Sequence, residues 1–171
     1  MTEARVVLRH VTDADAATLR GIAWRSWEAA YGRFLSEADR RAFFAEFYGA
    51  DGHCRAVRSE RSLFLLAQAD GAPVAFLLAS VDRGLVHLHR LYADPARQRR
   101  GAGQALWDAL VAWARDRGAE RIEFEVASEG ESGPPFYRKQ GCRPIRETVM
   151  PVGRTPVGVT VYEYRLGSAQ L

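Results

Sequence analysis

The order of its apolar segments predicts that this chain is one α/β domain with a mostly antiparallel central sheet. Two apolar runs at 62–68 and 73–80 are separated only by Ala-Asp-Gly-Ala, which is typical of a β-hairpin. Helical patterns lie before this hairpin and again after the next strand, so the predicted order is β-α-α-β-β-β-α-β-α-β-β. A chain of 171 residues, 47% of them hydrophobic, fits one domain at 1–171 with a full core.

The N-terminal part predicts one strand followed by two helices. An apolar segment at 5–8 is typical of a short strand, and Thr-Asp-Ala-Asp at 12–15 offers capping residues for a helix that runs to about Tyr31. One helical face of that segment is apolar, at Leu19, Ile22, Ala23, Trp27 and Ala30. A second helix is expected from about Glu37 to Tyr48.

The C-terminal half alternates strands and helices. A turn at Arg83-Gly84 leads into a strand from Leu85 to Ala93, and the following helix ends near Gly118, a residue that favours a helix C-terminus. The remaining predictions are a strand at 121–126, a short helix at 136–140 after a Gly/Ser/Pro-rich break at 128–135, and strands at 143–150 and 157–166.

Charge and cysteine content narrow the classes of function. A net charge of +3 is too small to argue for a nucleic-acid partner. The first ten residues lack the apolar core of a signal peptide, and no apolar run is long enough to span a membrane. The two cysteines, Cys54 and Cys142, are far apart and have no metal-ligand spacing. We therefore expect a reduced, cytoplasmic protein without a metal.

The segment Gln-Arg-Arg-Gly-Ala-Gly at 98–103 places donor-rich side chains and two glycines at a predicted helix start. Unpaired amides at a helix N-terminus bind anions, and glycine lets a phosphate approach them closely. A nucleotide triphosphatase loop would need Gly-Lys followed by Ser or Thr, which the chain lacks. A dinucleotide-binding fold would need a third glycine shortly after Gly103, and none stands at the required place. A basic, solvated turn is the alternative to an anion site.

Two motifs in the right order resemble the GNAT superfamily of N-acetyltransferases. They are Leu-Tyr-Ala-Asp-Pro-Ala-Arg-Gln-Arg-Arg-Gly-Ala-Gly-Gln-Ala-Leu at 91–106 and Phe-Tyr-Arg-Lys-Gln-Gly-Cys at 136–142. The resemblance implies a sheet of about seven strands, with strands 4 and 5 splayed, and about four helices. It also implies that acetyl-CoA binds at Leu91, Tyr92, Ala93, Gln98, Arg99, Arg100, Gly101, Ala102, Gly103 and Gln104.

Three residues are candidates for proton transfer. His87 and His89 alternate on one strand, so both imidazoles are expected on one face, together with Leu91. His-Leu-His resembles arylalkylamine N-acetyltransferases, where a histidine pair relays the substrate proton; a glutamate acting through water, or two structural histidines, are the alternatives. Tyr137 matches the family tyrosine beside the thioester sulfur, and a core tyrosine is its alternative.

The resemblance implies a small-molecule amine or a peptide as acceptor; no nucleic acid or membrane is expected, and a homodimer stays open. Trp27, Tyr31 and Phe34 concentrate aromatic surface where the family places its acceptor, although aromatics at helical spacing are more often core. Glu123 and Glu125 share a strand face, and such carboxylates are mostly solvated or paired. The competing function is a non-catalytic coenzyme A-binding regulatory module.

Overall fold

A computed structural model describes residues 5–97, 101–129 and 133–167, and it confirms the predicted α/β class. Within those residues seven strands form one sheet in the order β1-β2-β3-β4-β5-β7-β6. All neighbouring strands are antiparallel except β4 and β5, which are parallel. In chain order the elements are β1 (Val6–His10), α1 (Ala16–Tyr31), α2 (Glu37–Phe47), α3 (Ala50–Arg58), β2 (Ser62–Ala69), β3 (Ala72–Asp82), β4 (Leu85–Ala93), α4 (Ala102–Asp116), β5 (Arg121–Ala127), α5 (Gly133–Lys139), β6 (Arg143–Val152) and β7 (Thr155–Arg165).

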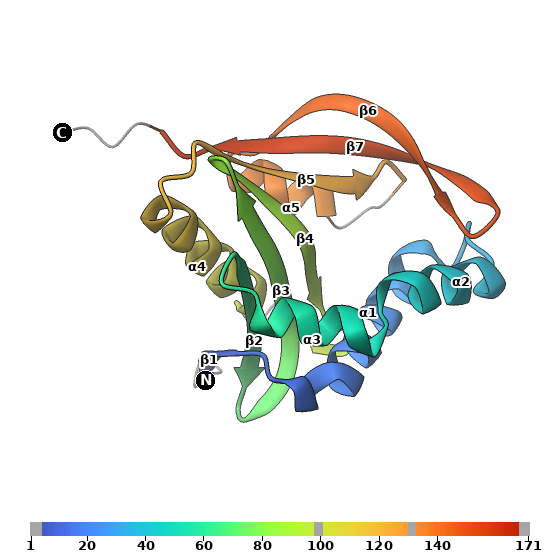
Figure 1. Cartoon of the computed structure of the whole chain (residues 1–171). Helices are drawn as coiled ribbons and strands as arrows, with labels where there is room; N and C mark the ends of the chain where they lie inside the picture. Colours follow the sequence, from blue (N-terminus) through green and yellow to red (C-terminus); the bar gives the residue numbers. More distant parts are fainter. Residues whose placement is uncertain (1–4, 98–100, 130–132, 168–171) are drawn as a thin grey trace.

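Helices cover both faces of the sheet and divide the core in two (Figure 1). On one face, Leu106 and Leu110 of α4 and Tyr137 of α5 are buried against the strands. On the other face, Ile22 of α1 and Phe44 of α2 are buried. Both faces of β2 and β3 are therefore apolar, which explains why these strands appear in the sequence as continuous apolar runs.

The sheet opens between β4 and β5. The two strands pair only at Leu85–His87 with Arg121–Glu123, and beyond that point they run apart (Figure 1). The expected splay of the fourth and fifth strands is thereby confirmed. Because β5 continues to pair with β7 along its whole length, the opening separates two intact halves of one sheet.

Two helix predictions need correction. The nine-residue helix α3 was not predicted, because it contains Gly52, follows Gly49 and buries no residue fully, so the sequence shows no strong helical pattern there. Helix α5 begins at Gly133 rather than near Phe136. Pro134 and Pro135 occupy its first turn, where a missing backbone N–H leaves no helical hydrogen bond unmade.

Candidate active site

The opening leaves one edge of β4 unpaired. Asp94 donates its backbone N–H to Val74 of β3 at 2.8 Å, and hydrogen-bonded pairs alternate along an antiparallel ladder. Tyr92 therefore directs its backbone groups toward β3, whereas Leu91 and Ala93 direct theirs into the opening. An extended ligand lying beside β4 would find these donors and acceptors, as the predicted contacts of Leu91 and Ala93 require.

A β-bulge at His89 changes which face each β4 side chain occupies. Ala79 pairs with Leu88 and the adjacent Leu78 pairs with Arg90, so β4 has one extra residue at His89. An inserted residue reverses the alternation of side chains beyond it. Leu91 consequently packs into the core beneath α4, on the face opposite the two histidines, and the prediction that the imidazoles share its face is wrong.

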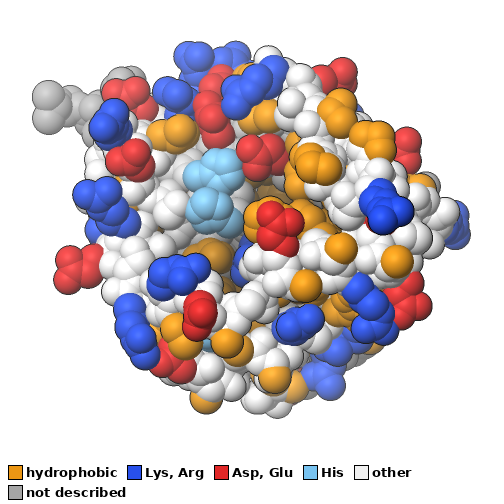
Figure 2. Space-filling view, turned by 45° about the vertical axis from the view of Figure 1, so that its right-hand side comes forward, with side chains coloured by type: hydrophobic (Ala, Val, Ile, Leu, Met, Phe, Trp, Pro, Cys, Tyr) orange, Lys and Arg blue, Asp and Glu red, His pale blue; other side chains and the backbone are white. Residues whose placement is uncertain are grey.

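The two imidazoles themselves lie side by side, as predicted. The ring centroids of His87 and His89 are 4.6 Å apart. Figure 2 shows two adjacent histidines at a hollow of the surface, bordered by acidic and hydrophobic side chains. The pair is therefore open to a ligand that enters this hollow.

Each histidine has a different partner. Nε2 of His87 lies 3.3 Å from Oε2 of Glu125, and Nε2 of His89 lies 2.6 Å from Oγ of Ser80. The hydrogen bond from His87 lowers the pKa of Glu125, so this carboxylate is ionised at neutral pH. The side chain of His89 is partly in contact with solvent. Desolvation by the surrounding protein, together with the nearby His87 and Arg90, lowers the pKa of its imidazole, so the ring is neutral at pH 7.

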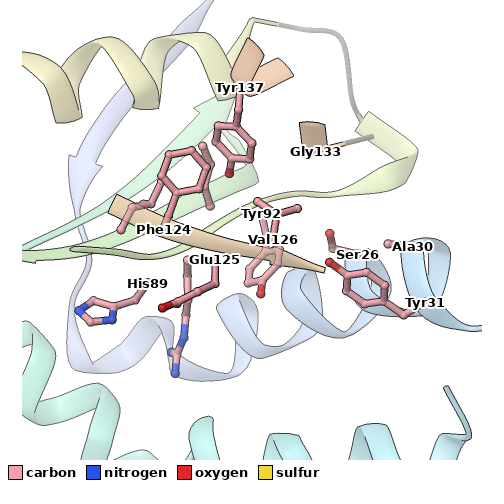
Figure 3. Close-up of a pocket in the computed structure, with 13 residues that line it drawn as sticks. Ser26, Ala30, Tyr31, His89, Tyr92, Phe124, Glu125, Val126, Gly133 and Tyr137 are labelled. Atoms are coloured by element: carbon pink, nitrogen blue, oxygen red, sulfur yellow. The ribbon is translucent and has the colours of Figure 1, made fainter. Parts of the chain in front are cut away.

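Tyr137 enters the site from the opposite side. Its ring is 8% exposed and packs on Phe124 at 4.3 Å between centroids and on Trp107 at 6.0 Å. Burial raises the pKa of the phenol far above its usual value, so the hydroxyl keeps its proton. Figure 3 shows Tyr137 extending from α5 with its hydroxyl on the side where Tyr92 and Val126 lie.

Two cavities meet at this site. The first, which we call the gap cavity, measures about 120 Å³ and lies where β4 and β5 part, with Leu91, Phe124 and Tyr137 in its walls. The second, which we call the hairpin cavity, measures about 180 Å³ and reaches the β6–β7 hairpin. Four residues line both cavities: Tyr31, His89, Tyr92 and Glu125.

The N-terminus of α4 has the backbone form that an anion site needs. Gly101 precedes the helix with φ of +77°, a conformation that favours glycine, and a Cβ at this position would meet no atom within 4 Å. The amides of Ala102, Gly103 and Gln104 stand in the first helical turn, where no helical carbonyl pairs with them. The predicted contacts of Gln98, Arg99 and Arg100 lie outside the described residues.

Two predicted coenzyme A contacts have side chains engaged elsewhere. The amide of Gln104 exchanges hydrogen bonds of 2.9 and 2.7 Å with Gln140, so its backbone N–H is the group left for a ligand. The hydroxyl of Tyr92 accepts a hydrogen bond of 2.9 Å from Nε1 of Trp27. Tyr92 thus ties β4 to α1 at the boundary of the two cavities.

The predicted acceptor aromatics divide into two groups. Trp27 and Tyr31 line the hairpin cavity, with ring centroids 5.1 Å apart. Phe34 is not among the lining residues; it packs on the outer side of Tyr31 at 5.6 Å. Phe34 therefore supports the wall and does not form it.

Sequence reasoning missed several residues of the site. Ser80 and the hairpin-cavity residues Phe43, Met150, Val152, Val157 and Val159 belong to no motif, so no local signal identifies them. Glu125 was considered together with Glu123. Glu123 accepts a hydrogen bond of 3.0 Å from Nε of Arg121. Of the two glutamates, Glu125 is the one that faces the histidines, because Glu125 lies beyond the point where β4 and β5 separate.

Comparison with known proteins agrees with this architecture. The model of a family described as the acetyltransferase (GNAT) family matches residues 18–142, well over half of the chain. An uncharacterized N-acetyltransferase of Methanocaldococcus jannaschii is 27% identical over 85 residues, which cover 46% of this chain and 38% of that protein. The match thus spans well under half of that relative's length.

Solved structures share the fold along nearly the whole chain. The PaiA N-acetyltransferase from Thermoplasma acidophilum, in complex with coenzyme A, superposes with a TM-score of 0.82 at 22% identity, covering 94% of this chain and 99% of that one. A GCN5-related N-acetyltransferase from Rhodopseudomonas palustris gives a TM-score of 0.77 at 25% identity, covering 96% and 98%. Within the described residues, no helix is both long and apolar enough to cross a bilayer, and no cluster of three metal-binding side chains occurs.

Proposed function

Because this chain belongs to the acetyltransferase (GNAT) family, we propose that it transfers an acetyl group from acetyl-CoA to a primary amine of a small molecule or peptide. The observation that carries the proposal is the meeting of two cavities at His89, Tyr92, Glu125 and Tyr31. The gap cavity lies where β4 and β5 part, and the hairpin cavity extends from the shared residues to the β6–β7 hairpin. A donor and an acceptor can thus approach one point from different sides.

The donor side is suited to coenzyme A. Leu91 and Ala93 offer backbone groups to a pantetheine arm in the gap cavity, and Gly101 with the first amides of α4 offers an anion site for its pyrophosphate. Acetyl-CoA supplies an acetyl thioester, whose carbonyl carbon is the electrophile. This assignment needs no side-chain rearrangement at Gln104, because a phosphate would bind the backbone.

The acceptor must lose a proton before it can attack. A primary ammonium has a pKa of about 10.4, so at pH 7 nearly all of it carries a proton. We assign His87 as the base, because the ionised Glu125 beside it stabilises the charge that a proton brings to the imidazole. His89 contributes a neutral imidazole that accepts a hydrogen bond from the bound amine.

Tyr137 stabilises charge that develops on the departing sulfur. A phenol of about pKa 10 is a weaker acid than a thiol of about 8.5, and burial strengthens this difference. The hydroxyl therefore donates a hydrogen bond to the sulfur and retains its proton. Its ring is held in place by Phe124 and Trp107.

Thiol release from acetyl-CoA in the presence of a panel of primary amines tests the proposed function. We expect at least one amine to raise thiol release above the amine-free rate, with the N-acetyl product detected by mass spectrometry. Tight coenzyme A binding without thiol release for any amine would instead identify the non-catalytic regulatory module.

His87→Ala tests the assigned base. The neutral-pH limb of the kcat/KM profile should flatten, because the imidazole assigned as the base is gone. Acetyl-CoA affinity should not change, since the His87 side chain does not line the gap cavity. A pH profile like that of the unmodified enzyme would remove His87 as the base.

The cysteines support a proposed location in the cytoplasm. Cys54 and Cys142 are both free, as expected for a protein in a reducing compartment such as the cytoplasm. Measurement of free thiols in the protein isolated under alkylating conditions checks this assignment.

A further inference from the structure

The hairpin cavity is apolar at one end and charged at the other. The far walls consist of Leu35, Phe43, Met150, Val152, Val157 and Val159. The near end holds Glu125 with the two histidines. In the wall between them, Nε1 of Trp27 donates a hydrogen bond of 2.9 Å to the hydroxyl of Tyr92, and Tyr31 lies beside this pair in the lining. The near end of the cavity thus offers one anionic group among polar side chains, whereas the far walls are apolar.

A contact joins α2 to the β6–β7 turn, close to wall residues of the cavity. Oδ1 of Asp39 accepts the backbone N–H of Arg154 at 2.9 Å, and Oδ2 accepts the hydroxyl of Thr155 at 2.6 Å. Figure 1 shows the end of the hairpin reaching α2. Gly153 in the turn has φ of +58°, and a Cβ there would lie 2.3 Å from Asp39 Oδ1. The two segments therefore meet without a gap.

This contact lies between the apolar walls. Phe43 stands four residues after Asp39, so the two share one side of α2, and Leu35 lies just before the start of this helix. Val152 and Val157 flank the turn that Asp39 binds. Any widening between α2 and the hairpin would move these four lining residues apart and deepen the cavity.

We propose that the acceptor is a primary amine on a compact apolar body, and that the contact of Asp39 with the β6–β7 turn sets the depth of the cavity that selects it. The inference rests on the proposed function, because it identifies the hairpin cavity as the acceptor site. The ammonium group pairs with Glu125, beside His87 and His89, and the apolar body occupies the far end.

The chemistry of the walls excludes a hydrophilic body. A hydroxyl or second ammonium at the far end would lose water and find no partner, which is costly. The volume of about 180 Å³ lies below the ~300–1,000 Å³ usual for drug-sized ligands. A compact alkyl or phenyl group suits both the apolar far walls and the small volume, whereas a polyamine or a polar peptide suits neither.

Binding of amines to the enzyme saturated with coenzyme A tests the acceptor class without turnover. By calorimetry, 2-phenylethylamine should bind at least about 10-fold more tightly than spermidine or an unmodified tetra-alanine peptide, with a negative heat-capacity change. Equal or tighter binding of spermidine or the peptide would overturn the acceptor class. If 2-phenylethylamine binds selectively but no amine is acetylated, the acceptor class stands and the proposed function fails. If only hydrophilic amines are acetylated, the proposed function stands and the acceptor class fails.

Matched substitutions locate the apolar body. Val159→Thr introduces a hydroxyl into the wall and should weaken 2-phenylethylamine binding by about 10-fold. Val149→Thr, the same change at a 65% exposed position of the neighbouring strand, should have no effect. If Val159→Thr lowers stability, Met150→Gln repeats the test at a wall position that is partly exposed. Coenzyme A affinity verifies folding in each case, and unchanged amine binding in both wall variants would contradict the assignment.

Asp39→Ala tests the depth of the cavity. The preference for 2-phenylethylamine over 4-phenylbutylamine should fall by about 10-fold, because the end wall can recede. Gly153→Ala, whose new methyl group would collide with Asp39, should act in the same direction. Asp82→Ala, an exposed aspartate at the end of β3, is the control and should keep the preference. An unchanged preference in both Asp39→Ala and Gly153→Ala would overturn the role of this contact.

Discussion

The two sides of the candidate active site are built in opposite ways. The proposed coenzyme A contacts depend mainly on backbone: the free edge of β4 and the first turn of α4 belong to one short stretch of chain. The hairpin cavity depends on side chains, and its walls come from α1, α2, β4, β5 and the β6–β7 hairpin. A ligand bound by backbone amides leaves a compact motif, whereas a ligand bound by side chains from distant segments leaves none.

The boundary between the cavities combines both forms of construction. The bulge at His89 is a backbone feature, but it determines which side chains face the boundary. Glu125 reaches His87 only because β5 runs away from β4 after Glu123. The proton-transfer residues therefore depend on how the sheet opens as much as on their positions in the sequence.

Tyr137→Phe should have the largest effect and would place the Tyr137 hydroxyl beside the departing sulfur. Loss of a hydrogen bond to developing charge should lower kcat by about 100-fold. The affinities for acetyl-CoA and for the amine should stay within about two-fold, because the ring remains packed on Phe124. Tyr164→Phe is the control: Tyr164 packs on the same Trp107, at 5.5 Å, without lining either cavity. Equal losses of turnover and affinity would indicate that Tyr137 serves packing alone.

Gly101→Val should have an effect of intermediate size, and only on the donor side. A β-branched residue at φ of +77° costs roughly 1–2 kcal/mol and distorts the start of α4, so the Kd of acetyl-CoA should rise about 10-fold. Gly118→Val carries a similar strain at the other end of α4, with φ of +67°, and should lower stability without changing the Kd. An unchanged Kd in Gly101→Val would remove the anion site, and a changed amine Kd would contradict the separation of the two sides.

Ser80→Ala should have the smallest effect. Removal of one hydrogen bond to Nε2 of His89 should lower kcat by about five-fold, because the imidazole loses its orienting partner. Both dissociation constants should stay at their original values. Ser80→Thr keeps the hydroxyl and should restore the rate; failure of this rescue would assign Ser80 to packing.

The sequence predicted the frame of this site better than its details. The order of strands, the splay of β4 and β5 and the membership in the GNAT superfamily are confirmed. The narrower likeness to arylalkylamine N-acetyltransferases stays a prediction. Leu91 was assigned to the wrong face because strict alternation assumes an unbroken strand, and a bulge cannot be read from His-Leu-His. Helix α3 was missed because its packing is peripheral.

By itself the sequence determined the family and the order of the strands, and it supplied the proposed donor motif, because each depends on residues close together in the chain. Only the tertiary structure decided that Glu125, not Glu123, faces His87 and that Asp39 binds the β6–β7 turn. Asp39 and Arg154 are 115 residues apart, and local chemistry holds no information about such a contact. The donor side is therefore predictable from short-range pattern, while acceptor choice depends on how distant segments pack.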